Sequence, residues 1–569
     1  MKSKKILALL AVAIPTILAS CTPANDSSSS SGNPSGDTSS TSTPSDYSSY
    51  KKLTDFSKAT MEYTDSNGNR QTLDRHLMEQ NSGAPCLRST GEQRMLVVPV
   101  GLDDDTGTSP AYPTVSRSGR TEKQTTERLD QIEKLFFGEA EDTGWQSLKS
   151  YYYTSSHGKL TITGNVMRCD GGWFKPGKKP SEYSSAQAVT DIKKYYIAEY
   201  KKDNHGALGA DAKDWTWYDQ DKDGYIDSIW IVYSAAIHAY ESSTTSMSYW
   251  AYVTSTGNSG SVASPAISKY AWASIDFMDQ AYGEGLDGHT FIHETGHLFG
   301  NDDYYSYDDT EAPLGGIDMQ DHNIGDHNAF TKWQFGWEAP YVIDDSAYIE
   351  MEPTTTSGQF CIIPSQNFNG TYADEYMMIE FMSPVGLNEE YKTGYSNTTG
   401  YTKPGLRITH VDARAYKSKN TEILSTPEEV ATATQFRVMN TPSGRGYAYW
   451  KDHFDKANNS TKKDRSMYFI NVMQASSFTE EKNLLTQSTT STNSDLFTKG
   501  FTFDLTAYDD GNGKMVNDWY CLMPSYSNLW NKAQDPLTRK VDASCTFNYT
   551  VEVLDVTKDK VKFVIEKIA

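Results

Sequence analysis

The sequence His293-Glu294-Thr295-Gly296-His297 is the feature that most narrows what this chain can fold into. On an α-helix, residues four positions apart lie on one face, so both imidazoles can reach a single zinc ion. Glu294 lies one position further round, where a carboxylate can act on the metal-bound water without being a ligand. The motif therefore predicts a helix that carries a hydrolytic zinc site.

A third zinc ligand is expected shortly after this helix. Gly300 follows His297 by three residues, the spacing at which a chain can end a helix and turn back through positive φ. Asp303 then supplies a carboxylate on the returning chain, and hydrolytic zinc sites need a third protein ligand. We expect zinc to be held by His293, His297 and Asp303, with Glu294 as the catalytic base. The alternative is a helix whose two histidines only pack or form hydrogen bonds.

A second metal-binding pattern lies at residues 219–227, which read Asp-Gln-Asp-Lys-Asp-Gly-Tyr-Ile-Asp. Carboxylates at positions 1, 3, 5 and 9 with glycine at position 6 follow the calcium-loop pattern, in which position 7 gives its backbone oxygen. Trp230 stands at position 12, where an EF-hand needs glutamate, so this is not a full EF-hand. We expect a structural calcium site where the loop meets the apolar strand 229–233, with these ligands: Asp219, Asp221, Asp223, Tyr225 and Asp227. An acidic turn without calcium is the alternative.

The start of the chain resembles a bacterial lipoprotein signal. Three lysines precede an apolar run from Ile6 to Leu18, and the run ends in Leu18-Ala19-Ser20-Cys21. This pattern predicts a signal peptide at residues 1–20 and a lipid anchor on Cys21, at the outer face of a bacterial cell membrane. The alternative is an ordinary secretory signal with an incidental cysteine. Residues 21–50 are rich in serine and threonine and predict a flexible tether.

Composition excludes one class of partner. The chain has 74 acidic and 52 basic residues and a sequence pI of about 4.9, so it lacks the basic surface that binding to nucleic acid requires. Aromatic residues make up 12%, which is enough to build packed cores. The six cysteines leave disulfide pairing open. Oligomeric state is also left open.

The hydrophobic pattern predicts two domains with mixed α+β content overall. Up to about residue 340, helical stripes alternate with strands, and the clearest segments are strands at 95–100 and 160–166 and helices that include residues 129–136 and 189–200. Beyond residue 340 the segments favour strands: 376–381, 405–411, 468–473, 551–554 and 561–565. We therefore expect a catalytic domain at 51–340 and a β-rich, sandwich-like domain at 341–569.

The extended motif resembles that of a known group of peptidases. His-Glu-x-x-His-x-x-Gly-x-x-Asp, followed by Ile317-Asp318-Met319, is similar to the metzincin plan, in which a methionine-containing turn underlies the zinc. More closely, the chain resembles the immune inhibitor A family of secreted bacterial metallopeptidases, peptidase family M6. Further landmarks of the resemblance lie at 96–102, 147–152, 155–160, 328–337, 404–412 and 494–497. The resemblance implies a zincin-like catalytic domain with Met319 in the turn.

This sequence also departs from the metzincin pattern. Asp303 replaces the third histidine of most metzincins, although aspartate is compatible with the M6 pattern. Asp321 stands where some metzincins have a tyrosine two residues after the methionine. The donor that steadies the tetrahedral intermediate is therefore unassigned, and four residues are candidates for it: Tyr304, Tyr305, His322 and His327.

These features favour a lipid-anchored zinc endopeptidase that hydrolyses extended polypeptides. A non-catalytic surface adhesin or substrate-capture lipoprotein on the same scaffold is the alternative, but a binding module has no need of Glu294. Residues 51–90 are a candidate pro-segment. Within them Cys86 either blocks the zinc as a thiolate or is a small buried residue.

Overall fold

The computed structural model describes most of the chain after residue 46. The described residues are 47–56, 62–73, 79, 83–103, 125–237, 249–279, 285–307, 310–365, 368–416, 424, 426–433, 435–436, 440, 468–476, 485–504, 508–509, 515–516, 529 and 548–568. Residues 1–50 and 51–569 form two separate units. In the first unit only 47–50 are described, with a 3-10 turn at Tyr47–Ser49. The predicted signal peptide, Cys21 and most of the predicted tether lie outside the described residues.

A five-stranded sheet in the order β5-β4-β6-β8-β7 forms the scaffold of the candidate site. Its strands are β4 (Gly91–Val100), β5 (Leu160–Val166), β6 (Ser228–Tyr233), β7 (Tyr252–Ser255) and β8 (Lys269–Ser274). The first four in the sheet order are parallel, and β7 alone runs antiparallel to its neighbour β8.

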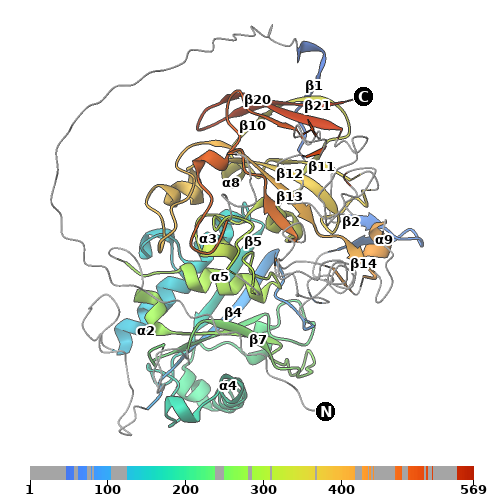
Figure 1. Cartoon of the computed structure of the whole chain (residues 1–569). Helices are drawn as coiled ribbons and strands as arrows, with labels where there is room; N and C mark the ends of the chain where they lie inside the picture. The colour runs from blue at the N-terminus through green and yellow to red at the C-terminus, as the bar shows by residue number, and fades with distance from the viewer. Residues whose placement is uncertain are drawn as a thin grey trace, which may run out of the picture. The chain divides into compact units, whose positions relative to one another are not determined.

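Helices cover both faces of this sheet, so its central strands are apolar on both sides. On one face lie α2 (Thr125–Phe137), α3 (Leu148–Ser155) and α5 (His289–Leu298), and on the other lies α4 (Ser185–Tyr200) (Figure 1). Successive side chains of β4 alternate between the two cores: Met95 and Val97 pack with the first group of helices, Leu96 and Val98 with α4. Such continuous apolar strands are typical of parallel sheets buried on both faces.

The helices expected around residues 129–136 and 189–200 are present as α2 and α4. The side chain of Ser184 accepts a hydrogen bond from the backbone N–H of Gln187 and begins α4. Ser147 begins α3 with a capping box. The expected stripe of α2, Leu129, Ile132, Leu135 and Phe136, is fully buried.

Two further five-stranded sheets are built from the rest of the chain. One has the order β16-β13-β12-β11-β9 and the other β1-β10-β21-β20-β17. Their strands are β1 (Lys51–Leu53), β9 (Tyr341–Val342), β10 (Ala347–Met351), β11 (Phe360–Pro364), β12 (Glu375–Met382), β13 (Gly405–Asp412), β16 (Ile470–Val472), β17 (Thr502–Asp504), β20 (Tyr549–Val556) and β21 (Val561–Lys567). The strands expected beyond residue 340 are therefore present.

The two sheets share one apolar core. Cys361, Ile379 and Ile408 from the first sheet belong to the same buried cluster as Ile349 and Phe563 from the second. The opposite face of the first sheet packs, through side chains of β11 and β12, on the core that contains α5. The chain is thus a mixed α and β protein with several mixed sheets, and a domain boundary near residue 340 stays a prediction.

Shorter elements complete the described fold: η2 (Ala140–Asp142), η3 (Pro180–Glu182), η4 (Asp203–Leu208), η5 (Trp215–Tyr218), η6 (Ile275–Asp279), α6 (Met319–His322), α7 (Ala329–Gln334), α8 (Thr354–Ser357), η7 (Gly386–Lys392), α9 (Pro427–Val430), η9 (Asn493–Asp495), and the strand pairs β2 (Glu62–Thr64) with β3 (Arg70–Thr72), β14 (Ala415–Tyr416) with β15 (Gln435–Phe436), and β18 (Tyr508–Asp509) with β19 (Met515–Val516). None of the helices in the described part of the chain is both long enough and apolar enough to cross a bilayer. The cysteines within it, Cys86, Cys169 and Cys361, form no disulfides.

Candidate metal centre

The helix α5 holds the His-Glu-x-x-His motif and is almost entirely buried. Atoms of His293, Glu294 and His297 that could bind a metal all lie within 4.8 Å of one another. The helix ends at Leu298, and Gly300 follows with φ +99°, a conformation that glycine adopts without strain. This turn returns the chain so that Asp303 lies beside both imidazoles, as the spacing predicts.

The imidazoles are oriented by main-chain carbonyls. Nδ1 of His293 lies 2.7 Å from the carbonyl oxygen of Met319, and Nδ1 of His297 lies 2.7 Å from that of Asn301. Because a carbonyl only accepts, Nδ1 carries the ring proton in both residues, and Nε2 of each neutral ring presents a lone pair. Hydrogen bonds of this kind fix the tautomer of metal-binding histidines.

Both lone pairs face the same carboxylate oxygen. Oδ1 of Asp303 lies 2.8 Å from Nε2 of His293 and 3.5 Å from Nε2 of His297. This oxygen is buried and has no partner in hydrogen-bond geometry among the described residues. Three acceptors that converge in a buried place repel one another unless a cation or protons lie between them. The donor set therefore fits a metal ion with two nitrogen ligands and one oxygen ligand.

Without a metal, protons fill this role. Burial by itself lowers the pKa of His297, but the carboxylate of Asp303 outweighs burial and raises this pKa to about 10. The pKa of His293 is raised in the same way, and the pKa of Asp303 is held well below its ordinary value by the two imidazoles although burial opposes this. Metal binding here must therefore release protons.

Glu294 lies beside the two histidines with 8% of its surface exposed. Burial is the largest influence on its carboxyl group and raises its pKa above the ordinary value, while the neighbouring imidazoles oppose the rise. A carboxylate with a raised pKa next to a metal site is suited to accept and return a proton.

The turn at Ile317-Asp318-Met319 lies against α5, as the resemblance implies. Met319 is fully buried, and its carbonyl is the one that orients His293. The next side chain, Gln320, packs so closely on α5 that a Cβ atom built on Gly296 lies 2.0 Å from Gln320 Oε1. A side chain at position 296 would therefore force the buried amide of Gln320 to move.

The four candidate donors to the reacting carbonyl have different surroundings. The hydroxyl of Tyr304 forms buried hydrogen bonds with Thr331 and Asn301. His322 bonds to the carbonyl of Gln487, and His327 lies among aromatic rings that include Tyr151 and Trp337.

Tyr305 is the remaining candidate. Burial raises its pKa well above 10, and the negative charges of Asp303 and Glu294 raise it further. Its phenol therefore stays protonated beside the centre and can donate a hydrogen bond.

Sequence reasoning missed a buried ionic cluster at the beginning of α5. The ring of His289 lies 2.7 Å (Nδ1) from Asp287 and 2.5 Å (Nε2) from Glu390. It is stacked between Trp145, at 4.5 Å between ring centroids, and Tyr395, at 3.7 Å. Burial alone lowers the pKa of His289, but the two carboxylates raise it to about 9. No local pattern marks this cluster, because Glu390 is 101 positions away.

The acidic loop at 219–227 brings three of its predicted ligands together. Carboxylate oxygens of Asp219, Asp221 and Asp227 lie within 4.8 Å of one another. Asp223 is not part of this group, and its Oδ1 accepts the backbone N–H of Tyr225. A backbone ligand from Tyr225 stays a prediction.

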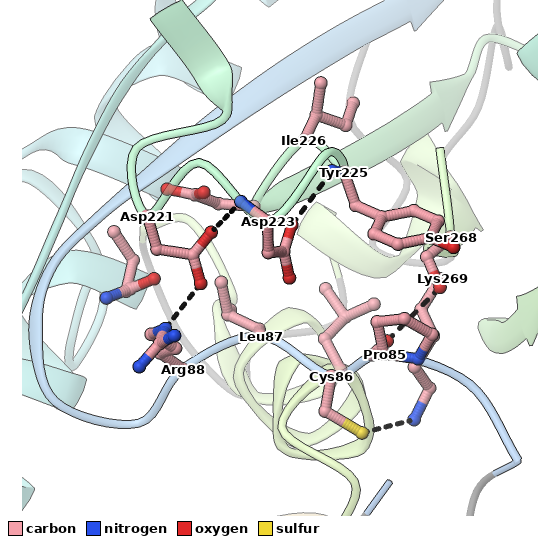
Figure 2. A pocket seen from close by; sticks show the side chains of 13 residues that line it. Pro85, Cys86, Leu87, Arg88, Asp221, Asp223, Tyr225, Ile226, Ser268 and Lys269 are labelled. Carbon is pink, nitrogen blue, oxygen red and sulfur yellow. Dashed lines mark hydrogen bonds and ion pairs between the residues drawn. The ribbon is translucent and has the colours of Figure 1, made fainter. Parts of the chain in front are cut away.

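The charges of this loop are only partly balanced. Asp219 is buried, and its Oδ1 has no hydrogen-bond partner in the described structure. Burial raises the pKa of Asp227 to about 7, although two backbone N–H groups oppose the rise. Asp221 forms an ion pair with Arg88 (Figure 2). A buried acceptor without a partner fits a cation that is bound between these carboxylates.

Cys86 lies near the end of α5, where the backbone N–H of its neighbour Leu87 donates to the carbonyl of Leu298. It lines a small pocket next to the acidic loop, and its sulfur is 3.7 Å from Nζ of Lys269 (Figure 2). The same Nζ donates to the carbonyl of His297 at the end of α5. Cys86 is 5% exposed, in keeping with the interpretation as a small buried residue.

Comparison of the chain with protein-family models and with curated protein sequences gives no match.

Proposed function

We propose that this chain is a zinc endopeptidase of the immune inhibitor A type, anchored by lipid at the outer face of a bacterial membrane. The observation that carries the proposal is the convergence of His293 Nε2, His297 Nε2 and Asp303 Oδ1, three largely buried acceptors whose orientation is fixed by neighbouring groups. Three acceptors this close to one another need a cation or protons between them, and a metal ion meets this need with all three as ligands.

His293, His297 and Asp303 would hold the metal, and Glu294 stands beside them as the proton carrier. When bound, zinc polarises the scissile carbonyl and lowers the pKa of the attacking water. Glu294 takes a proton from that water and delivers it to the leaving amine, a transfer for which its raised pKa is suited. The hydroxyl of Tyr305 donates a hydrogen bond to the carbonyl oxygen as negative charge develops there.

The fold offers an extended polypeptide a place to bind. β7 has one partner, β8, among the described strands, and it packs near α5. A substrate can add to such an edge by main-chain hydrogen bonds. Two aromatic side chains at or next to this strand, Trp250 and Tyr252, are 42% and 58% exposed and can contact substrate side chains. We therefore propose proteins or peptides as substrates.

Calcium is proposed for the acidic loop, with Asp219, Asp221 and Asp227 as the ligands that the geometry favours. Carboxylates are the ligands that Ca²⁺ prefers. Oδ1 of Asp219 accepts no hydrogen bond among the described residues, so it is available to a cation. The lipid anchor on Cys21 rests on the sequence motif alone.

The decisive experiment compares the chain lacking residues 1–21 with its Glu294→Ala and His293→Ala variants. We expect bound zinc and chelator-sensitive cleavage of casein in the parent chain. Glu294→Ala should keep zinc and lose about 100- to 10,000-fold in kcat/KM, whereas His293→Ala should lose both. Unchanged cleavage in Glu294→Ala would falsify the assignment. Zinc binding without any cleavage in the parent chain would favour the adhesin alternative.

A further inference from the structure

The two oxygens of Asp303 have different surroundings. Oδ1 faces the imidazoles of His293 and His297, as described above. Oδ2 accepts a hydrogen bond from the hydroxyl of Tyr307, four residues further along the chain. The sequence motif does not include Tyr307, and nothing in the spacing of the zinc ligands points to it.

The same hydroxyl is also bound to the main chain of Asp303. The backbone N–H of Asp303 donates to Tyr307 Oη at 3.3 Å. The phenol hydroxyl therefore accepts a hydrogen bond from the backbone of Asp303 and donates one to its side chain. These two hydrogen bonds restrict rotation of the carboxylate about its side-chain bonds, and they determine which oxygen faces the histidines.

The ring of Tyr307 is placed to act through its hydroxyl more than through packing. The residue is 37% exposed, so its aromatic surface contributes little to the buried core. Its ring rests edge-on against Tyr305, with 5.7 Å between the centroids. Removal of the hydroxyl alone, by Tyr307→Phe, should therefore leave the fold intact and release Oδ2 of Asp303.

We propose that Tyr307 is a positioning residue of the metal centre: it holds Oδ2 of Asp303 so that Oδ1 is presented to a metal bound by His293 and His297. This inference rests on the proposed function. Groups that hydrogen-bond to metal ligands commonly account for 10- to 100-fold in metal affinity, because a ligand that is free to rotate loses conformational freedom when the metal binds.

The test measures zinc affinity by competition with a chromophoric chelator, using the purified full chain in detergent. Tyr307→Phe is compared with the parent and with Tyr153→Phe, which removes a hydroxyl from a 54% exposed tyrosine on α3. We expect Tyr307→Phe to bind zinc about 10- to 100-fold more weakly and Tyr153→Phe to match the parent within twofold. The visible spectrum of the Co²⁺-loaded chain should change in Tyr307→Phe only, because the third ligand is less well held.

Two further measurements separate this role from others. Tyr307→Phe removes a hydrogen bond to a buried carboxylate, so the thermal midpoint of its metal-free chain should fall modestly below that of Tyr153→Phe. A metal-free Tyr307→Phe chain that no longer unfolds cooperatively would show a structural role and overturn the inference. A tyrosinate charge-transfer band in the Cu²⁺-loaded parent that is lost in Tyr307→Phe would make Tyr307 a direct ligand, which also overturns it.

Failure of this inference can be distinguished from failure of the proposed function. Zinc affinity of Tyr307→Phe within twofold of a zinc-binding parent would overturn the role of Tyr307 alone. A parent chain whose zinc binding is absent, or is unaffected by His293→Ala, would overturn the metal centre itself.

Discussion

Replacement of His289 by glutamine tests how the beginning of α5 is held. In the folded chain the imidazolium of His289 bridges Asp287 and Glu390 in a buried site. Its pKa is about 9 against an ordinary value of 6.5. This difference of about 2.5 pH units, at about 1.4 kcal/mol per unit, corresponds to about 3 kcal/mol of stability from the bound proton.

The sign of the pH dependence follows from the raised pKa. The stability that protonated His289 adds to the folded chain is fully present below pH 6.5, where the histidine is protonated in both the folded and the unfolded chain. This stabilisation falls as the pH rises from 6.5 and is lost above about pH 9. The parent chain should therefore lose about 3 kcal/mol between pH 6 and pH 10 that His289→Gln does not lose.

The assay is unfolding by urea at several pH values between 6 and 10, followed by fluorescence, for the parent and His289→Gln. Subtraction of the two curves removes the groups that titrate alike in both. His205→Gln is the matched control, because His205 is half-buried on η4, far along the chain from α5. A difference between the parent and His289→Gln that stays constant from pH 6 to pH 10 would refute the reasoning.

The remaining predictions concern the helix motif and the acidic loop. Gly296→Ala should lower the thermal midpoint and weaken zinc binding, because the new Cβ meets Gln320 at 2.0 Å. The double variant with Gln320→Ala should recover most of the lost thermal stability and zinc affinity. No recovery would contradict the steric explanation. Calcium should raise the thermal midpoint more at pH 8 than at pH 6. The reason is that Asp227, with a pKa of about 7 when metal-free, is ionised and costly to bury at pH 8 but largely protonated at pH 6. A calcium effect that is independent of pH, or absent at pH 8, would count against the site.

Local signals in the sequence were sufficient to predict many of the helices and strands. The continuous apolar run of β4 and the stripe of α2 reflect burial of one segment at a time, which the pattern of side chains records directly. The close approach of His293, His297 and Asp303 was predictable for the same reason, since these residues lie within eleven consecutive positions and the helix period relates the first two.

Contacts between distant segments were not predictable from such patterns. Glu390 at His289 and Gln320 at Gly296 are brought in by tertiary packing, and one sequence carries no record of either pairing. Tyr307 is close to Asp303 in sequence, but its role depends on the path of the chain after Gly300, which the motif does not determine. Asp223 accepts the backbone N–H of Tyr225 within the loop, and its role as a calcium ligand stays a prediction.

The order of the sheet β1-β10-β21-β20-β17 has a consequence for how the chain reaches its native state. β21 lies between β10 and β20, and it joins β10 across a large separation: the backbone N–H of Lys567 bonds to Ser346, 221 positions away along the chain. Closing a loop of that length costs entropy before any contact compensates for it. β20 and β21 pair as a local hairpin, whereas β10 joins β21 only across the long separation. The sheet is therefore expected to be completed late in folding, and until then the edges of β10 and β21 are exposed to pairing with other chains. Folding of this protein is then a competition between docking of the β20–β21 hairpin on β10 and aggregation.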